Sequence, residues 1–238
     1  MRAAPVRPGV ARAPRRDVLW RDGRPCPAPG RSMSGRAPVS PEVLGQLRGR
    51  LPAMLGGEHS ITAGAVRAAK KRFSRLSVLQ LDAHADMRDS YLESPDSHAC
   101  VMRRIREICP AASVGIRSLS EEEAEHLKSH PAPIWSVRKL RALSGDWKPI
   151  LDALTDDVFI TFDLDGLDPA HLPGTGTPEP GGLEWYETND LIAAVAAKKR
   201  VVGFDVVELA PLAGSVASDF LAARVTYRMI GHMLKSQR

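Results

Sequence analysis

Two short apolar runs, each followed directly by acidic residues, constrain the fold of this chain most. The run 77–81 leads into the pentad Asp82-Ala83-His84-Ala85-Asp86, and the run 158–162 leads into Asp163-Leu164-Asp165. In an extended chain, side chains at positions i, i+2 and i+4 point the same way. In an open α/β sheet, the carboxyl ends of the strands border one crevice, where ligands bind. The two runs therefore predict neighbouring parallel strands with an acidic site at their ends.

Strands and helices alternate along the rest of the chain. We predict strands at 52–55, 77–82, 112–117, 133–135, 158–163 and 201–207, and we expect the first of them to be buried. We predict helices from Pro41, at 61–73, at 97–109, from Ser120, and at 145–154, 188–199 and 216–234. Strands that alternate with helices form βαβ units, in which helices cover both faces of a parallel sheet. The predicted fold class is α/β, a three-layer α/β/α arrangement with a mostly parallel sheet.

The composition is that of a globular protein, with 43% hydrophobic and 26% charged residues. No apolar run approaches the length of about 20 residues that crosses a bilayer, and no secretory signal is apparent at the N-terminus. The three cysteines, Cys26, Cys100 and Cys109, lack CxxC spacing, which argues against a disulfide framework and a cysteine-based zinc site. We therefore expect a cytoplasmic protein without a membrane partner.

Basic residues are concentrated near the N-terminus. Residues 1–50 contain eleven Arg and three acidic residues, a local charge of +8, so that the rest of the chain carries −3 of the total +5. No aromatic residues are interleaved with these arginines, so we expect no nucleic-acid partner. Residues 1–40 are rich in Arg, Pro, Gly and Ala and lack apolar periodicity, which predicts a poorly ordered leader before one domain over 41–238.

Candidate metal ligands occur in three segments where strands give way to loops. They are His59, then Asp82, His84 and Asp86, then Asp163 and Asp165. Carboxylates packed this closely repel one another, and divalent cations remove the repulsion. Four Asp with two His suit two hard or borderline ions such as Mn²⁺. Glycines at 56–57 and 166 are expected to allow close approach of the backbone at these strand ends.

Four motifs follow one another in a specific order. They are Gly56-Gly57-Glu58-His59-Ser60, the pentad 82–86, the signature 161–170 with its continuation to 182, and the segment 204–211. With these motifs, residues 41–236 resemble the ureohydrolases, the arginase and agmatinase family of binuclear manganese enzymes. Two positions differ from the commoner residue of that family, since Thr161 replaces Ser and Glu58 replaces Asp. The resemblance implies an arginase-like sheet and a homo-oligomer, a trimer or hexamer.

The resemblance also implies two Mn²⁺ ions per subunit. It places the first on His59, Asp82, Asp86 and Asp163, and the second on Asp82, His84, Asp163 and Asp165. Asp82 and Asp163 then bridge the ions. Four carboxylates against two divalent ions leave the centre nearly neutral, so that hydroxide becomes available near neutral pH.

Hydrolysis of a guanidino compound is the activity that the resemblance implies. Asp86 would orient the nucleophile and relay its proton to the departing amine. Glu208 would hold the guanidinium group through a charge-assisted pair, and His98 would act as a proton shuttle near the entrance.

The segment 89–98 resembles agmatinases and lacks the Asn- and Ser-bearing loop with which arginases hold arginine. Its acidic residues Asp89, Glu93 and Asp96 favour a substrate with a cationic far end. We therefore predict hydrolysis of agmatine to putrescine and urea, a step of polyamine metabolism. Two alternatives remain: another guanidino or formimino amidohydrolase of this family, such as arginase or guanidinobutyrase, and a truncated, non-catalytic ureohydrolase-like binding protein. Relatives have more chain before the first motif, so we expect that N-terminal strands of the sheet are missing.

Overall fold

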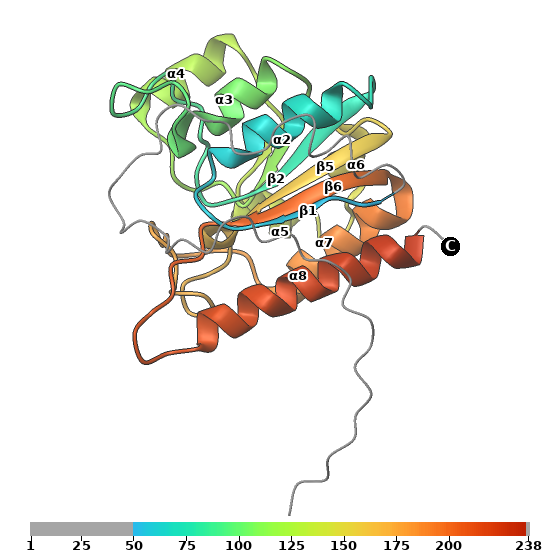
Figure 1. Ribbon diagram of the computed structural model, residues 1–238. Helices are drawn as coiled ribbons and strands as arrows, with labels where there is room; N and C mark the ends of the chain where they lie inside the picture. The colour runs from blue at the N-terminus through green and yellow to red at the C-terminus, as the bar shows by residue number, and fades with distance from the viewer. Residues whose placement is uncertain (1–49, 237–238) are drawn as a thin grey trace, which may run out of the picture. The chain divides into compact units, whose positions relative to one another are not determined.

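The computed structural model describes residues 50–236, where six strands form one sheet in the order β1-β6-β5-β2-β3-β4 (Figure 1). The strands are β1 (Ala53–Leu55), β2 (Leu76–Leu81), β3 (Ala111–Val114), β4 (Ile134–Trp135), β5 (Asp157–Asp163) and β6 (Arg200–Val207). All of their pairings are parallel. The predicted α/β class with a parallel sheet is therefore confirmed. The predicted leader at 1–40 and the helix from Pro41 lie outside the described residues.

Helices connect the strands and cover both faces of the sheet. They are α2 (Ile61–Lys70), α3 (Val101–Arg106), α4 (Glu121–Ser129), α5 (Val137–Ala142), α6 (Lys148–Asp152), α7 (Trp185–Lys198) and α8 (Ala217–Ser236), with short 3-10 turns at His98–Cys100 and Leu164–Gly166. Helices α2 and α3 lie on one face, and α7 and α8 lie on the other (Figure 1). Within the described residues, no helix is both long and apolar enough to span a membrane.

Alternation along the central strands supplies a core on each face. On β5, Phe159 packs with α2 and α3 residues such as Val66 and Ile105, whereas Ile160 packs into the cluster that includes α7 and α8. Successive side chains of a strand point to opposite faces, so a strand covered on both sides is apolar along its whole length. Strands β2 and β5 are buried throughout. They provide a rigid base for whatever follows their carboxyl ends.

Two sequence predictions differ from the structure. Strand β1 was expected to be buried, but Ala53 is exposed and Leu55 is 62% exposed. Within the described sheet, β1 pairs only with β6, so one of its edges has no neighbouring strand. The helix predicted at 145–154 is present as the shorter α6, and α5 is a further helix that the sequence does not predict, because it begins at Val137 where the Ser136 side chain accepts the Lys139 N–H.

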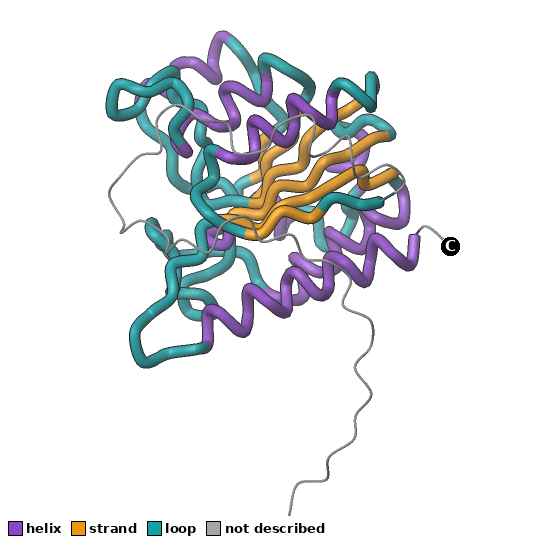
Figure 2. Tube along the Cα trace, viewed as in Figure 1, coloured by secondary structure: helices purple, strands orange, loops and turns teal. Residues whose placement is uncertain are grey.

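Because the strands are parallel, their carboxyl ends meet at one edge of the sheet. Figure 2 shows the long connecting loops gathered at that edge. Asp82 directly follows β2, Asp163 ends β5, and Glu208 directly follows β6. The fold thus places the acidic positions of three neighbouring strands around one region, as the sequence pattern predicts.

Candidate metal centre

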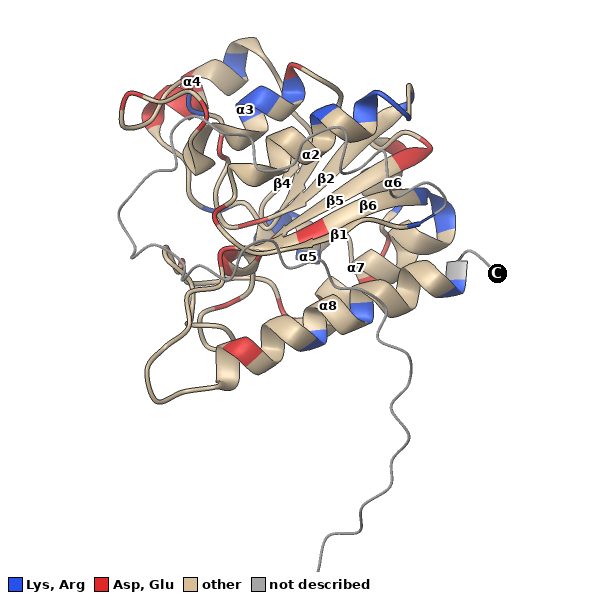
Figure 3. Ribbon diagram, viewed as in Figure 1, with Lys and Arg blue, Asp and Glu red and all other residues tan. Residues whose placement is uncertain are grey.

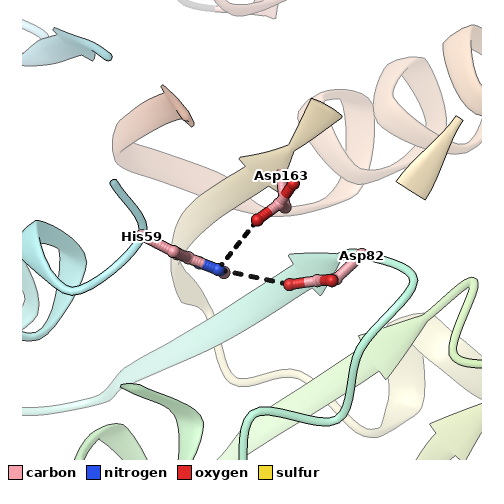
Figure 4. Close-up of side chains that lie close together, drawn as sticks. All are labelled: His59, Asp82 and Asp163. Carbon is pink, nitrogen blue, oxygen red and sulfur yellow. Dashed lines mark ion pairs between the residues drawn. The ribbon is translucent and has the colours of Figure 1, made fainter. Parts of the chain in front are cut away.

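His59, Asp82 and Asp163 converge from three separate segments (Figure 4). The Nδ1 atom of His59 lies 3.2 Å from an oxygen of Asp82 and 3.2 Å from an oxygen of Asp163. An oxygen of Asp86 lies 3.1 Å from the same nitrogen. All four side chains are buried. We call His59, Asp82 and Asp163 the inner ligand group, which Asp86 adjoins.

Asp82 also belongs to a second group with His84 and Asp165. The Nδ1 atom of His84 lies 3.0 Å from Oδ2 of Asp165 and 3.7 Å from Oδ1 of Asp82. The side chain of His84 is 24% exposed, whereas both carboxylates are buried. We call these three residues the outer ligand group. The structure thus brings all six predicted ligands together around the shared Asp82, but it does not group Asp163 with His84 and Asp165, so bridging by Asp163 stays a prediction.

Burial and repulsion from Asp82 raise the pKa of three neighbouring carboxyls, Asp86, Asp163 and Asp165. The pKa of Asp86 rises to about 7, and the pKa of Asp163 rises well above its usual range. Asp82 is buried too, but hydrogen bonds from His59 and His84 lower its pKa. Burial opposes the charged form of His84, but hydrogen bonds that its ring donates to Asp165 and Asp82 raise its pKa to about 11. Without cations the cluster therefore binds protons, which metal ions would displace.

The ring of His59 tests whether these residues fit a metal. Its Nδ1 atom is buried and makes no hydrogen bond within the described residues, although three carboxylate oxygens surround it. One ring nitrogen donates at most one hydrogen bond, so three converging oxygens suit a shared cation better than an N–H group. Oxygen-rich sites with some imidazole favour Mn²⁺-like ions. The residues present therefore fit a divalent metal centre.

A buried hydrogen-bond network supports the inner ligand group from behind. The Nε2 atom of His59 lies 2.8 Å from the hydroxyl of Thr161, which donates to Asp205 over 2.7 Å. Thr62 donates to the other oxygen of Asp205 over 2.8 Å. Such outer partners fix the orientation of a ligating imidazole. Sequence reasoning missed Asp205 and gave Thr161 no role, although both lie in the family motifs.

Loop contacts support the outer ligand group instead. Asp165 accepts hydrogen bonds from the backbone of Ala83 over 3.1 Å and from the hydroxyl of Thr177 over 3.0 Å. The guanidinium group of Arg117 donates to backbone carbonyls of Gly115, Asp165, Gly166, Leu167, Glu179 and Pro180 over 2.7–3.3 Å. The side chain of Arg117 therefore holds the loop after β5 through several hydrogen bonds. Sequence reasoning missed Arg117.

Glycine has different roles at the two places where close approach was predicted. A Cβ atom at Gly166 would lie 2.9 Å from the backbone nitrogen of Asp82, so close approach is confirmed there. At Gly56 and Gly57 an added Cβ would have no atom within 4 Å, so the prediction is wrong. Gly56 instead has φ +63°, a conformation that favours glycine.

A cavity of about 410 Å³ adjoins the ligands. Its lining includes members of both groups together with Asp86, Arg88, Tyr91, His98, Glu123, Gly176, Thr177 and Glu208. Acidic residues lie in the loops at this edge, whereas Lys and Arg lie on outer surfaces of helices such as α2, α3 and α8 (Figure 3). The structure thus brings the predicted catalytic residues Asp86, His98 and Glu208 to the same cavity.

Two of these residues have unusual backbone conformations. Asp86 has φ +53° and Glu208 has φ +64°, a region that side-chain-bearing residues rarely adopt. Glu208 accepts the backbone N–H of His59 over 2.6 Å, and burial raises the pKa of its carboxyl. Between residues 50 and 236, no Lys or Arg forms an ion pair with Glu208. A cationic ligand would therefore stabilise its charged form.

The acidic residues of segment 89–98 do not line the cavity. Asp89 lies 2.8 Å from Arg104 and 3.6 Å from Arg103, which neutralise its charge, and Glu93 and Asp96 are exposed. These three side chains thus lie outside the cavity lining, and a contact between them and a substrate stays a prediction. The cavity wall carries Glu123 instead, whose buried carboxylate accepts the backbone N–H groups of Met87 and Ser120.

The sequence model of the arginase family matches residues 38–231. The chain belongs to this family. It is 42% identical to an N(1)-aminopropylagmatine ureohydrolase of Synechocystis over 80% of this chain and 63% of that relative. It is 38% identical to an agmatinase of Bacillus anthracis over 69% of this chain and 57% of that relative.

A solved arginase-family structure has the same fold. The agmatine ureohydrolase of Thermoplasma volcanium superimposes with a TM-score of 0.74 at 37% sequence identity, covering 82% of this chain and 67% of the other. The match confirms the arginase-like sheet. The chain spans less than two thirds of the length of the curated relatives it matches, such as the 63% of the Synechocystis protein.

Proposed function

We propose that this chain binds two Mn²⁺ ions and hydrolyses a guanidino compound to urea and an amine. One observation carries the proposal: two ligand groups share Asp82 beside a cavity that contains Glu208 and His98. The first ion would take His59, Asp82, Asp86 and Asp163, and the second would take Asp82, His84, Asp163 and Asp165. When bound, the ions would supply hydroxide near neutral pH and stabilise developing negative charge.

The chain's own residues would position the substrate and move protons. Glu208 would hold the guanidinium group by charge-assisted hydrogen bonds, which aligns its central carbon for attack. A C–O bond forms at that carbon and a C–N bond breaks, so urea and an amine result. Asp86 would take the proton of the nucleophile and pass it to the departing nitrogen, and His98 would exchange protons with solvent.

The proposed substrate is an alkylguanidine with a cationic far end, either agmatine or N(1)-aminopropylagmatine. Two relatives named for these substrates support the proposal. The cavity wall supports it too, because Glu123 makes no ion pair with Lys or Arg of residues 50–236. Arg88 is the single Lys or Arg among the described lining residues, and its guanidinium group lies over the ring of Tyr91 at 5.3 Å. A negative wall favours an amine tail over a carboxylate tail.

Urea release from five substrates tests the proposal. The full chain is loaded with Mn²⁺, its metal content is measured, and agmatine, N(1)-aminopropylagmatine, arginine, guanidinobutyrate and formiminoglutamate are compared. We expect two ions per chain and the highest kcat/KM with one of the first two compounds. Faster turnover of one of the other three would assign a different substrate, and two ions without any urea would favour a binding role.

The remaining parts of the proposal concern the whole protein. We propose a domain over 41–238 with a leader at 1–40, assembly into a trimer or hexamer, a cytoplasmic location and a role in putrescine formation. Sedimentation analysis of the full chain tests the assembly, since a monomer at micromolar concentration would contradict it.

A further inference from the structure

Glu58 connects the first motif to the proposed proton shuttle. Its Oε1 atom accepts the backbone N–H of His98 over 3.1 Å and lies 2.6 Å from Nδ1 of the same residue. Its Oε2 atom accepts the hydroxyl of Ser60. The carboxylate is therefore held on one side by its own loop and binds both the main chain and the ring of His98 on the other.

These contacts determine which ring nitrogen of His98 is available. A carboxylate accepts and does not donate, so Nδ1 carries the proton of this hydrogen bond and Nε2 is left for other partners. The edge of the ring also packs on Tyr91, with ring centroids 5.5 Å apart. His98 is 42% exposed, and an exposed side chain without such contacts samples several rotamers.

We propose that Glu58 is a positioning residue that holds the imidazole of His98 with Nε2 directed to the cavity for proton transfer. This inference rests on the proposed function. It also gives a reason for Glu at this position, because an aspartate carboxylate would be shorter by one C–C bond, about 1.5 Å. Glu58 acts through His98 and does not itself contact the substrate.

A double-mutant cycle tests this role. We compare Glu58→Gln, His98→Asn and the double variant with the wild-type chain, using the substrate that gives most urea. We expect Glu58→Gln to lower kcat about tenfold with little change in KM, and His98→Asn to lower it about 100-fold. Because Glu58 acts through His98, the double variant should match His98→Asn within about twofold.

The matched control is a second Glu–His pair distant in sequence. His171 lies 2.7 Å from Glu184, with side chains that are 45% and 52% exposed, and neither residue lines the cavity. Glu184→Gln should leave kcat unchanged. The same loss of kcat from Glu58→Gln with and without His98 would overturn the inference, as would unchanged kcat.

Two further measurements separate the possible causes. Loss of bound Mn²⁺ from Glu58→Gln would show that Glu58 acts through the adjacent His59, which overturns the proposed role. Thermal unfolding of the wild-type chain, the two single variants and the double variant measures the Glu58–His98 interaction independently of activity. We expect Tm shifts that are not additive. No urea from the wild-type chain with any substrate would overturn the proposed function, whereas wild-type activity with an additive cycle would overturn only the role of Glu58.

Discussion

The inner and outer ligand groups share Asp82 but differ in what holds them. The inner group is buried, and Thr161 and Asp205 on the central strands support its histidine. The outer group includes the partly exposed His84 and depends on a loop that hydrogen bonds from Arg117 hold in place. Precise sites need supporting residues that are themselves rigid. The difference indicates that the sheet determines the positions of the inner ligands, whereas the side chain of Arg117 determines much of the position of the outer ligands.

The largest effect is expected from a change to the shared ligand. Asp82→Asn removes a charge from both groups, so we expect loss of both Mn²⁺ ions and a fall in urea release on the order of 10³-fold or more. Metal analysis after desalting measures the number of bound ions, and initial rates measure urea release. The control Asp89→Asn alters an exposed carboxylate and should retain both ions. Retention of one tightly bound ion by Asp82→Asn would show that the groups are independent.

A change behind the inner group should act on one ion. Thr161→Val keeps the shape of the side chain but removes the partner of His59 and a donor to Asp205. Loss of such an outer contact weakens metal binding about 10–100-fold. Competition with a fluorescent chelator should therefore reveal one weakened and one unchanged site. Thr226→Val, which removes only a hydrogen bond within α8, is the control and should bind both ions normally. Equal weakening of both sites would contradict the comparison.

A change to Arg117, which holds the loop after β5, should act on the ion of the outer ligand group. Lysine has a compact ammonium and cannot reproduce the planar fork of arginine, so Arg117→Lys should lose several carbonyl contacts. We expect about tenfold weaker binding of the outer ion and faster proteolysis within the loop 166–182. Arg106→Lys is the matched control, because Arg106 is also partly buried but, within the described residues, its side chain donates a single hydrogen bond, to the carbonyl of Pro131. Unchanged proteolysis of Arg117→Lys would contradict the proposed dependence.

The smallest predicted effect is the part of the pH dependence of Mn²⁺ binding that comes from the carboxyl group of Asp86. In the metal-free protein the pKa of Asp86 is about 7, so acidification adds a proton that metal must displace. Binding should therefore weaken as pH falls, and Asp86 contributes about fourfold between pH 8 and 6.5. His84, whose pKa is about 11, is protonated at both pH values and adds a separate, larger dependence. Calorimetric titration with Mn²⁺ in buffers of different ionisation enthalpy measures the protons released. Affinity that rises on acidification would have the wrong sign.

The sequence predicts the sheet well because the central strands β2 and β5 are largely apolar and are buried along their whole length. It predicts the separate helices less well, since α5 depends on the Ser136 cap and not on a long periodic pattern. The N-terminal edge is also misjudged, because β1 is apolar in sequence but Leu55 is exposed in the described sheet. Burial depends on which neighbours a strand has, and a local pattern does not contain that information.

At the metal centre, the sequence predicts the residue types but not their supports. The spacing argument expects an extended chain through the pentad, whereas β2 ends at Leu81 and Asp86 has a left-handed backbone. The carboxylate of Asp86 reaches His59 because the chain turns. The contacts of Arg117 with the loop and of Glu58 with His98 join residues 40 or more positions apart. Periodicity gives no signal for such long-range pairs.

Gly166 has a consequence for how this chain tolerates change. Its α-carbon passes so close to the start of the pentad that a methyl group there would press on the backbone of Asp82. Alanine at this position would alter no ligand and no charge. It would nevertheless displace a carboxylate that both proposed ions share, so one added carbon atom, on a residue that does not line the cavity, would disturb the whole centre.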